Sequence, residues 1–299
     1  MRHRETIRRD LESGFTIIEF LTVALLSSIL LTAVVNSFTQ LTRVSHDHEI
    51  KVIAQLQAQS VIDMLAPEIR MLGNGVPFHQ ANFLIAQQTL TNNTVTQPIV
   101  VSGTTANQIK FRLNQTGETY ILTADFNPIS SSSVTLTSVS KIYVGDQVYI
   151  TNATVGEDDG FWGTVAGISS AAKTITFASG TQFSPSSIFT KGSLLEVVPV
   201  ITYTSATNYG GIKRDDGLGA LTLVPSGQFT LQYLDINGNP LTLPLLATEA
   251  DPFPASAIQN VRSLKMTISV RSSSKLYSGQ YYVATAEQVV GIRNFNFKY

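Results

Sequence analysis

The chain of 299 residues contains no cysteine, and this absence sets the first limits on its chemistry. Without thiols the protein forms no disulfide and has no thiolate nucleophile. Charged residues are also sparse, at 14%, and 20 basic side chains against 21 acidic ones leave no basic excess that would indicate nucleic-acid binding. Stability therefore has to come from burial of the hydrophobic residues, which make up 43% of the chain.

Histidine is scarce as well, and its four positions are His3, His46, His48 and His79. His46 and His48 stand two positions apart on a predicted helix, so their side chains face different directions and do not form a metal site. The sequence contains no phosphate-binding loop, no Gly-x-Ser-x-Gly motif and no His-Glu-x-x-His motif. We therefore expect no catalytic residue, no metal, no cofactor and no enzymatic activity.

Two other segments permit a binding interpretation, but a structural one is favoured for each. Residues 235–239 alternate oxygen-bearing side chains like half of a calcium loop, yet Gly238 comes before the sixth position, where such a loop has its glycine, and Leu246 occupies the position of the twelfth-residue glutamate. An Asn-Gly pair between two strand patterns is typical of a hairpin turn. Phe161 and Trp162, the single tryptophan, are expected in a hydrophobic core rather than on a contact surface.

What the chain does contain is a long apolar segment directly after a short polar leader. Between Phe15 and Thr42 the only ionisable side chain is Glu19, and proline and glycine are absent. A continuous helix of this length is long enough to cross a bilayer. The leader, residues 1–14, has four arginines against three acidic residues, which favours its retention on the cytoplasmic side. Because acids in membrane spans are rare and usually paired, Glu19 requires a positive charge from outside its own segment.

The junction between leader and apolar segment, Ser-Gly-Phe-Thr-Ile-Ile-Glu at residues 13–19, resembles the class III signal of type IV pilins and pseudopilins. The resemblance implies that a prepilin peptidase cleaves after Gly14 and methylates the new amino group of Phe15. It also implies that Glu19 pairs with the N-terminus of a neighbouring subunit during assembly. The chain departs from many major pilins at Asn36, where they carry proline. The alternatives are an ordinary signal anchor with an accidental glutamate and an uncleaved transmembrane helix.

Beyond the apolar segment the helix is predicted to continue with one apolar face. This face consists of Ala58, Val61, Ile62, Leu65, Ile69 and Leu72, which recur at helical spacing. Pro67 lies opposite the face, and Gly73 supplies a stop signal. We therefore divide the helix into a membrane or filament-core part, residues 15–42, and an amphipathic part, residues 43–75, that packs on a sheet.

The rest of the chain reads as strands and turns. Ile109, Phe111 and Leu113 alternate with polar residues, including Arg112 and Asn114, which is the pattern of a half-buried strand. The predicted fold is α+β, with the long helix packed on an antiparallel β head. Residues 76–129 and 200–299 form the main sheet, and residues 130–199 form an inserted small barrel or sandwich, unless their strands belong to the main sheet.

The C-terminal part adds a looser similarity to PilW-like minor pilins and to J-type minor pseudopilins, in segments that include Phe229–Tyr233, Val261–Arg271 and Ala284–Asn294. The resemblance implies a structural subunit that primes or modulates pilus assembly, first as a single-pass inner-membrane protein with a periplasmic head and later in the pilus. Its partners would be the prepilin peptidase, other minor and major pilins and the inner-membrane assembly platform. The alternatives are a minor pseudopilin of a type II secretion system and an anchored adhesin whose binding module is the inserted block.

Replacing Gly14 with a bulky residue such as leucine is expected to block removal of the leader, since the resemblance places the cleaved bond directly after this glycine. Mass spectrometry of the purified variant should find an N-terminus that retains residues 1–14, whereas the unsubstituted protein should begin at Phe15. A leader that remains on the unsubstituted protein in its native host would contradict the assignment.

Overall fold

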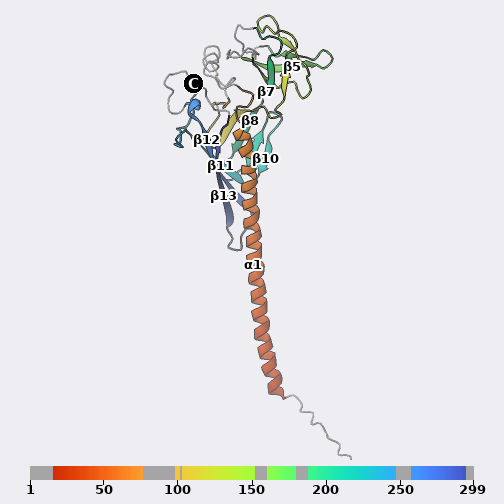
Figure 1. The fold of residues 1–299 in the computed structure, drawn as a ribbon. Helices are drawn as coiled ribbons and strands as arrows, with labels where there is room; N and C mark the ends of the chain where they lie inside the picture. The colour runs from red at the N-terminus through yellow and green to blue at the C-terminus, as the bar shows by residue number, and fades with distance from the viewer. Residues whose placement is uncertain are drawn as a thin grey trace, which may run out of the picture.

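The computed structural model describes residues 16–76, 98–101, 103–151, 160–179, 188–246 and 257–293. One long helix, α1 (Ile17–Arg70, 54 residues), projects from a β head that lies at its carboxyl end (Figure 1). All named strands of the described chain pair in antiparallel fashion. The predicted α+β class is confirmed, as is one continuous helix with an apolar N-terminal half.

Local signals define both ends of α1. Thr16 is the N-cap, and its hydroxyl accepts the backbone N–H of Glu19 at 3.3 Å. Pro67 lies on the exposed side of the last turns, where its missing N–H removes one intrahelical hydrogen bond without disturbing the packed face. Gly73 then adopts a positive φ of 79°, and its N–H donates to the carbonyl of Arg112 at 2.8 Å. The chain thus leaves the helix directly toward the first strand.

The second half of α1 packs through the apolar face that its periodicity predicts. All six predicted residues are buried, and Ile50 and Ala54 extend the same face toward the N-terminus. Ala54 and the six predicted residues lie in one core with the inner faces of β11 (Gly227–Leu234), β12 (Ser263–Lys275) and β13 (Tyr281–Gly291). Burying each large aliphatic side chain contributes about 1.5–3 kcal/mol, so this face holds the helix firmly on the head.

Two sheets share that core. The three-stranded sheet has the order β11-β12-β13, and a four-stranded sheet has the order β1-β8-β9-β10. The bounds of the second set are β1 (Gln108–Arg112), β8 (Val200–Ser205), β9 (Ile212–Asp215) and β10 (Leu221–Val224). A short 3₁₀ helix, η1 (Ile258–Asn260), precedes β12. The main part of the head is therefore built from segments on both sides of the region between β1 and β8.

The region between β1 and β8 forms a six-stranded sheet of its own, with the order β2-β7-β4-β5-β6-β3. Its strands are β2 (Thr119–Ile121), β3 (Ser133–Thr135), β4 (Gln147–Thr151), β5 (Gly160–Ser169), β6 (Thr174–Phe177) and β7 (Leu194–Val197). It encloses a second hydrophobic core, which includes Phe126, Phe161 and Phe189. The structure thus assigns β2 to this sheet, although residues 119–121 fall in the segment predicted as the first part of the head. A strand of three residues is too short to show which sheet it joins.

Hydrogen bonds also connect the two ends of this strand order. Leu122 and Leu136, which directly follow β2 and β3, form an antiparallel bridge. The N–H of Thr123 donates to the carbonyl of Thr135 at 2.9 Å, and the N–H of Thr137 donates to the carbonyl of Ile121 at 2.9 Å. The terminal strands of the order β2-β7-β4-β5-β6-β3 are therefore joined to each other as well.

The polar face of β1 differs from the prediction of a half-exposed strand. Arg112 and Asn114 are buried, with exposed fractions of 3% and 2%. Trp162 from β5 covers Arg112, with the guanidinium 5.2 Å from the ring centroid, and the Asn114 side-chain amide donates to the Glu196 carboxylate of β7 at 3.1 Å. Burial lowers the pKa of Arg112 to about 9. Trp162 is itself buried, as predicted, and it joins the six-stranded sheet to the main head.

A polar cluster ties the end of α1 to the four-stranded sheet. The Glu68 carboxylate accepts hydrogen bonds from the Tyr203 hydroxyl of β8 at 2.6 Å and from the Arg214 guanidinium of β9 at 3.0 Å. Arg214 also donates to Asp216 at 2.9 Å, and this bond lowers the pKa of Asp216. The cluster restrains the last turn of α1 against both β8 and β9.

Truncation of Leu65 to alanine should lower the free energy of unfolding of the main head by about 2–5 kcal/mol, because the side chain is fully buried between helix and sheet. Leu56→Ala is the matched control on the same helix; Leu56 is 64% exposed, and its truncation should change the value by less than about 0.5 kcal/mol. Urea unfolding in mild detergent, followed by near-ultraviolet circular dichroism, gives both numbers. Equal effects of the two substitutions would contradict the packing described.

Candidate functional site

The N-terminal half of α1 is apolar on every side and is not covered by the rest of the described protein. Ile17 is 81% exposed and Phe38 is 71% exposed, and the large apolar residues between them are exposed as well. A helix that is hydrophobic all round is either buried in a protein core or placed in a membrane. The segment is long and apolar enough to cross a bilayer, the requirement for an N-terminal membrane anchor or signal sequence.

Glu19 lies in the first turn of this helix and faces back toward its N-terminus. Its Oε2 accepts hydrogen bonds from the backbone N–H and the hydroxyl of Thr16, both at 3.0 Å. Together with the bond from the Glu19 N–H to the Thr16 hydroxyl, this is a capping box. The negative charge thus sits where the helix dipole and the free N–H groups stabilise it. Gly14 and Phe15, the predicted cleavage and methylation residues, lie outside the described residues.

The carboxylate of Glu19 retains capacity for a partner. An ionised carboxylate offers about four acceptor positions on two oxygens, and Thr16 occupies two of them. An ammonium group approaching the start of the helix would therefore meet a charge that the capping box has already oriented. Residues 16–19 have the Thr-x-x-Glu pattern that is typical of a capping box. The prediction of Glu19 as an assembly residue did not make use of this pattern.

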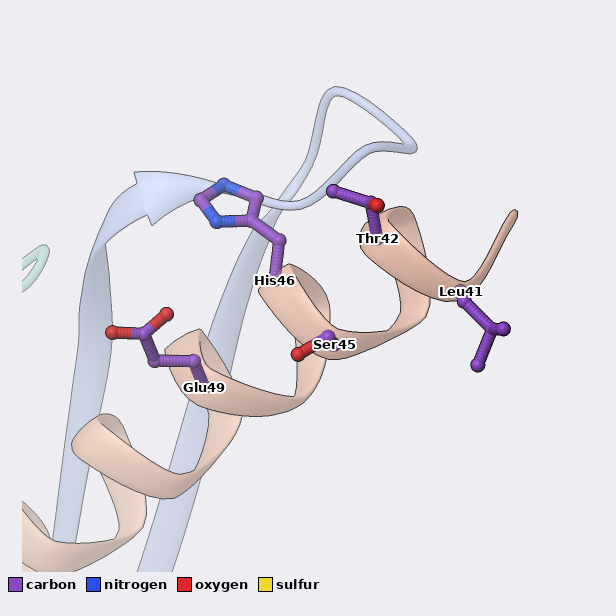
Figure 2. A pocket seen from close by; sticks show the side chains of 5 residues that line it. All are labelled: Leu41, Thr42, Ser45, His46 and Glu49. Carbon is purple, nitrogen blue, oxygen red and sulfur yellow. The ribbon is translucent and has the colours of Figure 1, made fainter. Parts of the chain in front are cut away.

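A polar face begins where the apolar segment ends. Its residues Thr42, Ser45, His46 and Glu49 line a shallow depression together with Leu41, whose side chain points away from Thr42 and His46 in Figure 2. His48 is not among them, in agreement with the prediction that the two histidines face different directions. Within the described ranges no group of three His, Cys, Asp or Glu side chains is arranged to hold a metal ion.

The chain between β12 and β13 contacts α1 at the same level. The backbone N–H of Tyr277 donates to Asp47 Oδ1 at 2.8 Å, and the Arg43 guanidinium lies 4.6 Å from the centroid of the Tyr277 ring. Further along the hairpin, Gln55 Nε2 donates to the Tyr282 hydroxyl at 3.3 Å. Sequence reasoning missed these contacts because more than 220 residues separate the partners and each pair carries no local pattern.

A second depression lies between the six-stranded sheet and the turn after β9. Lys141 and Tyr143, from the connection between β3 and β4, line one side of it, and Leu218, which is 90% exposed, lines the other. The Asp146 carboxylate accepts a hydrogen bond from the backbone N–H of Tyr143 at 2.7 Å, which stabilises the turn. Partial burial raises the pKa of Asp146. This mixture of aromatic and aliphatic side chains suits a contact surface better than a catalytic centre.

The segment that resembles half a calcium loop is a hairpin turn after β11. Asp235 Oδ1 accepts the backbone N–H groups of Asn237 at 2.8 Å and of Asn239 at 2.7 Å, and Leu234 forms a bridge with Pro240. The bond from the Asn239 N–H is the main reason why the pKa of Asp235 is lowered. The carboxylate is therefore used to close the turn, as the Asn-Gly pair predicts.

Addition of millimolar calcium is expected to leave the thermal midpoint of unfolding unchanged within about 1 °C, since a ligand stabilises only a fold that it binds. Differential scanning calorimetry with calcium and with a chelator gives the comparison, and magnesium serves as the control for ionic strength. A calcium-specific rise of several degrees that disappears in Asp235→Ala would show that the turn binds the ion after all.

No family model matches the chain, and neither a curated protein nor a solved structure shows significant similarity to it. The features available for assigning a function are therefore the exposed apolar helix, the oriented carboxylate of Glu19 and the β head at the opposite end of α1 (Figure 1).

Proposed function

We propose that the protein is a minor pilin-like structural subunit of a type IV pilus, held in the inner membrane by α1 and assembled into the filament through the same helix. One observation carries the proposal. A single acid, Glu19, stands in the first turn of a helix whose N-terminal half exposes apolar side chains on all sides, and it ends a junction that resembles a prepilin cleavage signal.

Charge pairing explains why this acid is retained in an apolar segment. Cleavage after Gly14 would leave the amino group of Phe15 next to Thr16, at the start of α1. In a filament the ammonium of one subunit would meet the Glu19 carboxylate of its neighbour. An ion left alone in apolar surroundings costs several kcal/mol, by rough estimate, so only the register that pairs both charges is stable. Glu19 would therefore both attract the neighbouring subunit and fix the register in which the two subunits pack.

The exposed side chains of α1 provide the second contribution. In a membrane they contact lipid, and in a filament they would contact the helices of neighbouring subunits. One face of the second half of α1 is already covered by the head, so the projecting half offers the larger apolar surface for such packing. A filament built this way has a core of apolar helices and carries the β heads on its outside. No step in this process requires a catalytic residue in the chain itself, and the energy for assembly comes from the assembly platform.

We assign the inserted block to a small closed barrel formed by residues 119–197. Three observations support this assignment: the continuous strand order, the bonds that join the ends of that order, and the separate core. The strands β5 and β7 lie at the end of the head opposite to the projecting helix (Figure 1). On a filament such a block would point away from the helical core. A head of this size is accommodated best at the filament tip.

Glu19→Ala is the test of the proposed function. The variant should be cleaved and inserted normally but should be depleted from sheared pili by more than about tenfold, because removing one partner of a desolvated ion pair costs about 3–5 kcal/mol. Immunoblots of membrane and pilus fractions measure this ratio. Glu19→Gln, which keeps the shape and removes the charge, should behave in the same way.

Thr22→Ala is the matched control, since it removes a polar side chain one turn further along α1. The Thr22 hydroxyl donates to the backbone carbonyl of Glu19 and not to its carboxylate. This variant should enter pili at the normal level. Normal incorporation of Glu19→Ala would overturn the proposed role of the carboxylate. Recovery of the unsubstituted protein only with secretion-system pseudopilins after crosslinking would transfer the same role to a secretion pseudopilus.

A further inference from the structure

The β12–β13 hairpin runs along α1 in the direction of the projecting apolar half (Figure 1). Its tip, residues 275–281, is closed by a hydrogen bond from the Leu276 N–H to the Gln280 carbonyl at 2.8 Å, with Gly279 at a φ of 82°. The tip reaches α1 at Arg43 and Asp47, through the two Tyr277 contacts described above. It is the part of the described head that contacts α1 closest to the apolar segment.

The level of this contact can be compared with the thickness of a bilayer. A hydrocarbon core about 30 Å thick is crossed by about 20 helical residues, at a rise of about 1.5 Å each. A core that begins just after Glu19, where the carboxylate can remain at the polar edge, ends near Thr39. Arg43 then lies about 6 Å further out, inside a headgroup layer of roughly 5–7 Å on each side.

The side chains of the tip have the chemistry of a membrane interface. Tyr277 is 60% exposed, and a tyrosine combines an apolar ring with a hydroxyl that suits the boundary between lipid and water. Arg43 and Lys275 are exposed cations beside it, and cations near a bilayer surface attract the phosphates of lipid headgroups. The nearby acid, Asp47, is half-buried and already accepts the Tyr277 N–H.

A second aromatic residue continues this arrangement along the hairpin. Tyr281 is 44% exposed, and the ammonium group of Lys275 lies 5.6 Å from its ring centroid. The acid of the polar helix face, Glu49, lies on another side of α1, because six positions beyond Arg43 correspond to a rotation of about 120° away from it at 3.6 residues per turn. The side of the molecule that carries the tip is therefore aromatic and basic.

We propose that, before assembly, the hairpin tip lies in the headgroup layer of the periplasmic leaflet, with Tyr277 and Lys275 bound to phospholipid headgroups. The head would then be held at a defined tilt on the bilayer by two attachments, α1 and the tip. The proposal rests on the part of the proposed function that places α1 across a membrane, and it does not depend on filament assembly or on the pairing of Glu19.

The absence of cysteine makes a direct measurement possible. Ser278→Cys, in the tip, and Leu218→Cys, at a 90% exposed position of the turn after β9, each provide a single site for a spin label. The full chain is reconstituted into vesicles of phosphatidylethanolamine and phosphatidylglycerol, and electron paramagnetic resonance measures collisions with a water-soluble nickel chelate. We expect the label at residue 278 to collide several-fold less often with nickel than the label at residue 218. Equal accessibility would overturn the proposal.

A second variant tests whether the tip side chains bind the headgroups or whether α1 alone holds the tip near the bilayer. Lys275→Ala and Tyr277→Ala are added to Ser278→Cys, and near-ultraviolet circular dichroism confirms that the head remains folded. Nickel accessibility at residue 278 should rise severalfold toward the value at residue 218. An unchanged value would show that α1 alone sets the depth, which would contradict the roles of Lys275 and Tyr277. Because purified protein in vesicles contains no assembly machinery, a failure of Glu19 to direct filament assembly would leave both measurements unaffected.

Discussion

The packing of the second half of α1 on the β head is the interaction on which the rest of the structure depends. Its buried residues share one core with two sheets, and Glu68 fixes the last turn to β8 and β9 through Tyr203 and Arg214. Because a helix transmits its direction rigidly along its axis, holding one half also fixes where the other half points. The projecting apolar segment is thus a rigid continuation of a helix that packs in the core of the head, and not a flexible tether.

The six-stranded sheet belongs to the head but does not contribute to that core. Its apolar residues form a separate cluster, and a small apolar contact with the main head is made by Tyr149 and Trp162, which pack with Val76 and Val198. The stacking of Arg112 on Trp162 adds a polar contact at this joint. The two halves of the head are therefore stabilised independently, while the joint keeps them together.

The sequence predicts those features that depend on local spacing. The apolar face from Ala58 to Leu72 follows from helical periodicity, and the turn at residues 235–239 follows from its Asn-Gly pair. The edges of the inserted sheet could not be predicted, because β2 and β3 have only three residues each. The contact of Tyr277 with Arg43 and Asp47 depends on the course of the whole chain, so no local pattern announces it. Glu19 was predicted only in part. The sequence shows that it is the single acid in an apolar segment, but its hydrogen bonds to Thr16 are known only from the structure.

The place where the six-stranded block enters the main sheet has a consequence for how such a protein can diversify. The block leaves the chain after β1 and returns before β8, and these two strands are direct neighbours, with Arg112 paired to Val200. The ends of the block are thus separated by about one strand spacing, roughly 5 Å, which a short turn could also span. The conformational entropy cost of closing the chain there rises only slowly with the length of the insert. A different module could therefore occupy this position during evolution while α1 and the main core stayed as they are.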